Sequence, residues 1–96
     1  MLRSSLEFQT VASPKNIVGP KVRETRDRLG WSQEKLAAKC QMAGWDISRG
    51  IVAAIEGRVR WVGDFELVLL AHVLRVPASD LLPFRVNWST LKDSLK

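Results

Sequence analysis

The residues of this chain that could do chemistry are hydrogen-bond donors rather than nucleophiles or metal ligands. Polar, basic and small residues gather at the starts of two expected helices and in the loop after the second. They are Ser32, Gln33, Ser48, Arg49, Gly50, Ala53, Arg58 and Arg60. Hydroxyl, amide and guanidinium groups donate hydrogen bonds to phosphate oxygens, and arginine also pairs with N7 and O6 of guanine. This set therefore predicts binding of a nucleic acid.

Patterns typical of catalysis are missing from the sequence. There is no carboxylate pair in an expected pocket, no serine nucleophile motif and no glycine-rich phosphate loop. Cys40 and His72 are each the single residue of their type, and we expect a small core residue and a partly exposed structural residue. We therefore expect a protein that is not an enzyme and that needs no metal or cofactor.

The charge of the chain is positive and unevenly distributed. The formal net charge is +5, from 15 basic and 10 acidic residues. Between Lys15 and Arg60 there are ten basic and five acidic residues, whereas the two flanks are each neutral. A localised basic excess is typical of a protein that binds a polyanion, although a basic surface kept for solubility would explain the charge equally well.

Nothing in the sequence predicts a membrane or secreted protein. The longest apolar run, residues 65–74, contains Glu66 and His72 and is too short to span a bilayer. The N-terminus carries Glu7 and no long apolar stretch of the kind found in a signal peptide. A single cysteine fits a reducing compartment. We therefore expect a cytoplasmic protein with no membrane partner.

Two short helices joined by a turn form the centre of the expected fold. Ser32 suits the N-cap of the first, which should run to about Ala43 with Gly44 after its end. Ser48 suits the N-cap of the second, which should end at Gly57. In a small basic protein, such a pair predicts a helix-turn-helix that lays its second helix against DNA.

Other expected helices flank this pair. One should begin near Gly19, because Pro20 suits the first helical position, and Gly30 should end it. Its inner face includes Arg26, which needs a carboxylate partner if it is buried. Another helix should have Asp64 as its N-cap, and Pro77 should start a short fifth helix.

The domain organisation follows from these elements. We expect an all-α, compact five-helix bundle over residues 17–83. Residues 1–16 should be a flexible N-terminal arm. Residues 84–96 should be a C-terminal tail, or a short element that pairs with a second copy.

Three segments of the chain, in this order, resemble the phage Cro/C1-repressor type of helix-turn-helix, also called the XRE family. They read RDRLGWSQEKLAAK, ISRGIVAAIEG and FELVLLAHVLRVPASDLL, and the similarity spans residues 18–83. The resemblance implies a five-helix bundle of the phage-repressor DNA-binding type that binds operator DNA as a homodimer. It also implies that Gln33 touches phosphate and braces the recognition helix, and that Arg26 and Glu56 form a buried ion pair.

The chain departs from the family pattern in three places. Residues 37–47 are longer than the usual connection, so helix two or its turn should be longer. The outward face of the third helix offers few polar groups, since Gly50 and Ala53 cannot hydrogen-bond a base through a side chain. The usual glycine two residues after the glutamate is Arg58 here.

Two functions remain open at this point. The first is a transcriptional regulator, a repressor, that binds double-stranded DNA in a sequence-dependent way. Lys21, Gln33, Arg58 and Arg60 would contact phosphates, and Arg49 would supply most of the base readout. The second is a protein-binding module such as an antitoxin or phage adaptor, which the few base readers and the expected exposure of Trp61 and Trp88 favour.

Overall fold

The computed structural model describes residues 13–83 together with Ser89 and Lys92. Between residues 13 and 83 it contains four α-helices and one 3₁₀ helix, and no strand. They are α2 (Gly19–Arg28), α3 (Gln33–Met42), α4 (Arg49–Glu56), α5 (Asp64–Leu74) and η2 (Ala78–Leu81). The expected all-α fold is confirmed, but its fifth element is a short 3₁₀ helix rather than an α-helix. Most of the predicted arm (1–16) and tail (84–96) lie outside the described residues.

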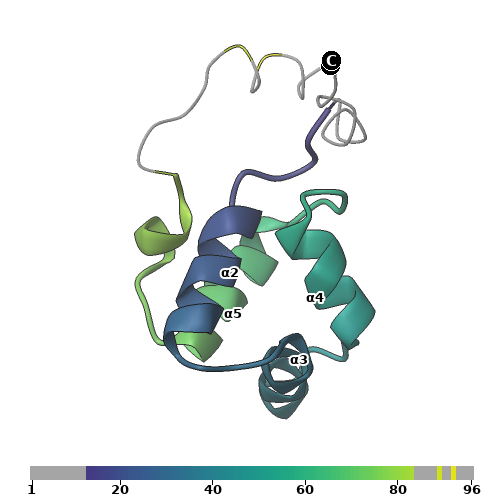
Figure 1. Ribbon diagram of the computed structural model, residues 1–96, viewed down its shortest axis with the longest axis vertical. Coiled ribbons are helices and arrows are strands. Elements are labelled where there is room, and N and C mark those ends of the chain that lie inside the picture. The colour runs from purple at the N-terminus through teal and green to yellow at the C-terminus, as the bar shows by residue number, and fades with distance from the viewer. Residues whose placement is uncertain (1–12, 84–88, 90–91, 93–96) are drawn as a thin grey trace.

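The helices surround one small core. α2 and α5 pack beside each other, with α4 on one side and η2 on the other, and α3 packs against both α4 and α5 (Figure 1). Each of the five elements places at least one side chain in the fully buried centre. These side chains are Val22, Leu36, Cys40, Val52, Ile55, Leu70, Leu74 and Leu81. α3 and α4 therefore cannot change position without disturbing the other elements.

Short-range signals set the limits of α3 and α4. The hydroxyl oxygens of Ser32 and Ser48 accept hydrogen bonds from the amides of Lys35 (3.0 Å) and Ile51 (3.3 Å). Gly44 follows α3 with φ +99°, a left-handed conformation that suits glycine. The predicted N-caps and this predicted helix end are therefore confirmed.

The start of α5 differs from the prediction. Gly63, not Asp64, is the N-cap, and Asp64 is the first helical residue. The cause is Glu66, whose carboxylate reaches back to accept the amide of Gly63 at 3.1 Å. Asp64 then lies inside the first turn, where its negative charge is favoured by the helix dipole.

The packed structure begins ahead of residue 17. The Asn16 side-chain oxygen accepts from the amides of Val18 (3.1 Å) and Gly19 (2.8 Å). Its amide nitrogen donates to the carbonyl oxygens of Ile55 (3.0 Å) and Arg60 (2.9 Å). One side chain thus bonds the beginning of α2 and the end of α4, and this joins the two helices end to end.

No helix within the described part of the chain combines the length and the apolar character that crossing a membrane requires.

Candidate nucleic-acid interface

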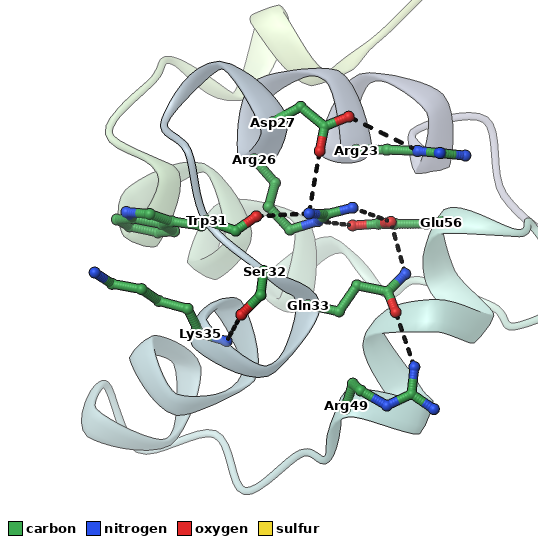
Figure 2. A network of polar contacts seen from close by, with 9 residues as sticks. All are labelled: Arg23, Arg26, Asp27, Trp31, Ser32, Gln33, Lys35, Arg49 and Glu56. Carbon is green, nitrogen blue, oxygen red and sulfur yellow. Dashed lines mark hydrogen bonds and ion pairs between the residues drawn. The ribbon is translucent and has the colours of Figure 1, made fainter.

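A buried ion pair supports the interface from inside. Arg26 on α2 donates two hydrogen bonds to the carboxylate of Glu56 at the end of α4, at 2.6 and 3.0 Å (Figure 2). The side chains are only 9% and 4% exposed. The hydrogen bond from Arg26 to Glu56 raises the pKa of the guanidinium above its ordinary value. The two residues that the resemblance pairs are therefore in direct contact in the structure.

Gln33 extends this network to the surface. Its side-chain nitrogen donates to Glu56 at 3.0 Å, and its side-chain oxygen accepts from Arg49 at 3.0 Å. A carboxylate only accepts and a guanidinium only donates, so these two neighbours fix which way the Gln33 amide points. The contacts run from Arg26 through Glu56 and Gln33 to Arg49, and they link the first turns of α3 and α4 (Figure 2).

The leading end of α4 is open to solvent. Ser48, Arg49 and Gly50 are exposed, and Ala53 is partly buried. A guanidinium has five N–H groups, and the contact with Gln33 uses one of them, so several remain to pair with a base. A side chain at Gly50 would meet only the Ser48 hydroxyl, at 3.6 Å, which leaves room for close approach of another molecule.

The hydroxyls of Ser32 and Ser48 lie at the two helix starts. Each oxygen accepts the capping hydrogen bond described above, while each O–H hydrogen can still be donated. The Gln33 side-chain nitrogen likewise has two hydrogens, of which Glu56 accepts one. These groups can donate to phosphate without breaking the contacts that hold the helices.

Arg58 and Arg60 are less available than the sequence suggested. Arg58 is partly buried and donates to the carbonyl oxygen of Asn16 at 3.1 Å. Arg60 donates to Glu66 at 2.9 and 3.2 Å and to the Trp61 carbonyl at 2.8 Å. Both guanidiniums therefore hold the loop after α4 in place, and phosphate would have to compete with these bonds.

Arg58 also occupies an unusual backbone conformation. Its φ is +65°, in the left-handed region that favours glycine. This is the position where the family pattern has glycine. The backbone therefore keeps the conformation that the family glycine would allow, and the arginine side chain is accommodated by packing beside Gly19.

Lys21, the remaining predicted phosphate contact, is on α2 and forms an ion pair with Glu24 at 3.5 Å. Lys21 has no contact with the network of Arg26, Glu56, Gln33 and Arg49. Of the predicted DNA contacts, this network contains Gln33 and Arg49.

Two structural residues were missed by the sequence analysis. Asn16 was assigned to the flexible arm, although asparagine side chains commonly bond backbone groups a few residues away in the chain. Gln41 donates to the carbonyl oxygen of Ile47 at 2.6 Å and so closes the longer connection between α3 and α4. No local pattern marks Gln41, because its partner is positioned only when the turn folds back.

Comparison with known proteins agrees with this arrangement. A family model described as "Helix-turn-helix" matches residues 22–81. The chain belongs to this helix-turn-helix family, of the Cro/C1 type. The match includes residues of all five elements and not of the two central helices alone, and the protein is a DNA-binding regulator of this family.

Two solved structures are similar to this chain over most of its length. The crystal structure of the restriction-modification controller protein C.AhdI from Aeromonas hydrophila is 29% identical, with a TM-score of 0.60, over 68% of this chain and 87% of that one. A hypothetical transcription factor, NHTF, from Neisseria is 28% identical, with a TM-score of 0.62, over 81% and 82% of the two chains. No curated protein matches the sequence significantly.

Proposed function

We propose that this protein binds double-stranded DNA by placing the leading end of α4 in the major groove. The observation that carries the proposal is the position of Arg49, which is exposed at the start of α4 and held by Gln33 at 3.0 Å. A side chain that is already oriented loses less conformational entropy when it binds. Arg49 is therefore the residue that we assign to direct base recognition, as a bidentate partner of guanine.

The other predicted contacts take supporting roles. Ser32, Gln33 and Ser48 would donate to phosphates at the two helix starts, where the helix dipoles also favour an anion. Gly50 and Ala53 would allow close approach and apolar contact, for instance with a thymine methyl group. Lys21, Arg58 and Arg60 stay predicted phosphate contacts. Their intramolecular partners should make each weaker than an unpaired cation.

We further propose that two copies bind one operator and that the bound protein regulates transcription, most simply as a repressor in the cytoplasm. Support comes from the family to which the chain belongs. Its restriction-modification neighbour is a controller protein and its second neighbour is described as a transcription factor. Two copies of one helix-turn-helix read half-sites about 34 Å apart, one turn of DNA.

The test compares Arg49→Ala with Arg58→Ala on a library of duplex sites at several salt concentrations. Arg49→Ala should relax preference at one base pair per half-site, with a loss of about 1–3 kcal/mol on the best site. Arg58→Ala should weaken all sequences equally and reduce the slope of affinity against salt.

Two results would contradict this proposal. If both variants changed affinity in the same way across the library, the separation into base and phosphate contacts would be wrong. If the unaltered protein bound no duplex at low salt and bound a protein instead, the adaptor alternative would replace it. The mass of the complex in solution reports whether two copies bind one duplex.

A further inference from the structure

A second surface of the molecule is apolar and contains none of the predicted DNA contacts. Trp61, Phe65 and Val68 are 60%, 87% and 60% exposed, and Leu82 is 41% exposed. We call these four residues the α5 patch. Phe65 and Val68 are three residues apart on α5 and therefore lie on the same face of the helix. Large apolar side chains grouped on one surface usually mark a site of interaction.

Two hollows join the members of the α5 patch. Trp61 and Phe65 line the first hollow. Trp61 and Leu82 line the second, a groove of about 380 Å³ that also borders residues 14–18. Because Trp61 belongs to both hollows and Val68 is the helical neighbour of Phe65, the four side chains form one continuous apolar surface.

The outward face of α5 carries no aspartate, glutamate, lysine or arginine between its two ends. Phe65, Val68 and His72 follow one another along it at helical spacing, and all three are exposed. Asp64 is the first residue of the helix and Arg75 follows its last residue, and both are exposed. Within the part of the chain that the structure describes, the Arg75 guanidinium has no partner. The face is therefore apolar along its length, with opposite charges at its two ends.

Such a face is complementary to a second copy of itself. In a two-fold contact both copies use the same surface, so that surface has to fit itself. If two α5 helices met antiparallel, their apolar faces would cover each other, and each Asp64 would lie near Arg75 of the partner subunit. A parallel arrangement would instead bring like charges together, which is unfavourable.

The area of the α5 patch fits an interface between two copies. A fully buried aromatic side chain covers about 150–250 Å², so the two exposed rings offer roughly 300 Å² and all four side chains roughly 500 Å². An interface of standard size buries about 800 Å² on each partner, of which about 60% is apolar. The patch therefore matches the apolar part of such an interface.

The charge of the chain favours contact between copies on this side of the molecule. Residues 61–82 contain three acidic residues and one arginine, a net charge of −2, whereas residues 15–60 carry +5. Two copies of a basic protein repel each other least where the basic excess is absent. The groove adjoins the loop after the last turn of α4, whereas Arg49 is in the first turn, so this contact leaves the leading end of α4 open (Figure 1).

We propose that two copies of this protein associate through the α5 patch, with their α5 helices antiparallel across a two-fold axis. Phe65 and Val68 of both copies are buried at the centre of this contact, and Asp64 faces Arg75 of the partner subunit at each edge. This inference rests on the proposed function, in which two copies bind one operator, and it adds the surface through which they meet.

The first experiment measures the mass of the protein by sedimentation, without DNA and over a wide range of concentrations. The unaltered protein should be a dimer that dissociates on dilution. Phe65→Ser/Val68→Ser should raise the dissociation constant of the dimer by about tenfold or more, because it removes apolar area from the centre of the contact. Met42→Ser is the control and should leave this constant unchanged, since Met42 is 81% exposed but lies on α3 outside the patch.

The second experiment tests the antiparallel arrangement with Arg75→Glu. This variant places two acidic side chains opposite each other at each edge, so the dimer should dissociate several-fold more readily, and most clearly at low salt. Arg23→Glu is the control, because it makes the same change of charge at an exposed position on α2. A lower net charge alone favours association, so equal behaviour of the two variants would contradict the arrangement.

Binding to DNA is measured separately, so that the two proposals can fail independently. The duplex is one selected from the site library, used whole and cut to a single half-site. Phe65→Ser/Val68→Ser should bind the single half-site as the unaltered protein does and lose affinity only for the whole site. If the unaltered protein dimerised through the patch but bound no duplex, the proposed function would be wrong and this inference would stand.

Two results would overturn the inference whatever the DNA measurements show. The first is an unaltered protein that stays monomeric at every concentration, which would mean that something other than a second copy covers the α5 patch. The second is a Phe65→Ser/Val68→Ser variant that dimerises as tightly as the unaltered protein, which would place the contact between copies elsewhere.

Discussion

At the scale of single residues, Glu56 has the most partners on the DNA-binding side of the core. Its carboxylate accepts from both Arg26 and Gln33 while its side chain is 4% exposed. A buried ion pair stabilises little by itself, because both charges lose their water. Removing one partner is costly, however, since the other charge then remains buried without compensation.

We therefore expect Glu56→Leu to lower the free energy of unfolding by roughly 3–5 kcal/mol. Arg26→Met/Glu56→Leu should be less destabilised than the sum of its two single variants, because neither charge is left alone. Urea denaturation of the four proteins gives this comparison. Additive losses would show that the pair is not coupled.

The thiol of Cys40 can be used to measure how often the core opens to solvent. Burial raises the pKa of its thiol to about 11, so at pH 8 almost no thiolate is present in the folded protein. A thiol reagent should label Cys40 only when the core opens, at a rate that rises with urea as the unfolded fraction rises. Met42→Cys is the control, since Met42 is 81% exposed and an added thiol there should react at once. Fast labelling of Cys40 in native buffer would contradict its burial.

Part of this residue-level picture could be read from the sequence. Ser32, Ser48 and Gly44 were predicted correctly because a cap acts on neighbours two to four residues away. The need of Arg26 for a carboxylate followed from its place on an inner face. The distant partners of Asn16 and the partner of Arg58 could not be predicted, since they lie 39–44 residues away and meet these side chains only in the packed molecule.

At the scale of elements, two helical glycines have opposite surroundings. A methyl group on Gly19 would overlap the carbonyl oxygen of Ile55 and lie 2.8 Å from that of Glu56, because α2 begins directly against the end of α4. Gly50 is in the first turn of α4, where a methyl group meets no close atom.

We expect Gly19→Ala to destabilise the protein by about 1–3 kcal/mol, as overpacking does. Gly50→Ala should instead stabilise it by up to about 1 kcal/mol, because alanine favours helix. If α4 seats closely on DNA, Gly50→Ala should also bind duplex more weakly despite its higher melting temperature. Thermal unfolding and DNA titration of both variants test these expectations. Unchanged affinity in Gly50→Ala would place that residue away from DNA.

The start of α5 should respond to acid. The hydrogen bond from Arg60 lowers the pKa of Glu66 and outweighs burial, which raises it, and the Gly63 amide adds a smaller lowering effect. Between the ordinary pKa of a glutamate and this lower folded value, the unfolded chain binds more protons. The contribution of Glu66 to the free energy of unfolding is therefore fully present above about pH 4.5. It is lost as the pH falls through the pKa of Glu66 in the folded protein.

Glu66→Gln should accordingly lose less stability than the unaltered protein between about pH 5 and pH 3, although glutamine can still accept from the Gly63 amide. Urea denaturation across this range measures the difference. When Arg60→Met is also present, the difference in acid stability between the protein with Glu66 and the Glu66→Gln variant should be smaller, because the main cause of the lowered pKa is gone. Parallel pH curves for the unaltered protein and the Glu66→Gln variant would show that the carboxylate has no such role.

At the scale of the whole molecule, the sequence predicted an all-helical fold and the order of its elements. It did not predict that the fifth element is a 3₁₀ helix, because both Pro77 and Pro83 restrict a segment too short to show a helical period. The position of the loop after α4 also escaped prediction. Arg60 is held there by Glu66 and lies over the Trp45 ring at 5.8 Å, and both contacts depend on how α5 packs.

The side chain of Asn16 bonds the beginning of α2 and the end of α4 at the same time. A force on the chain before Asn16 would reach the last turn of α4, at the opposite end of this helix from Arg49. A molecule that bound the segment just before Asn16 could therefore alter operator binding without covering Arg49.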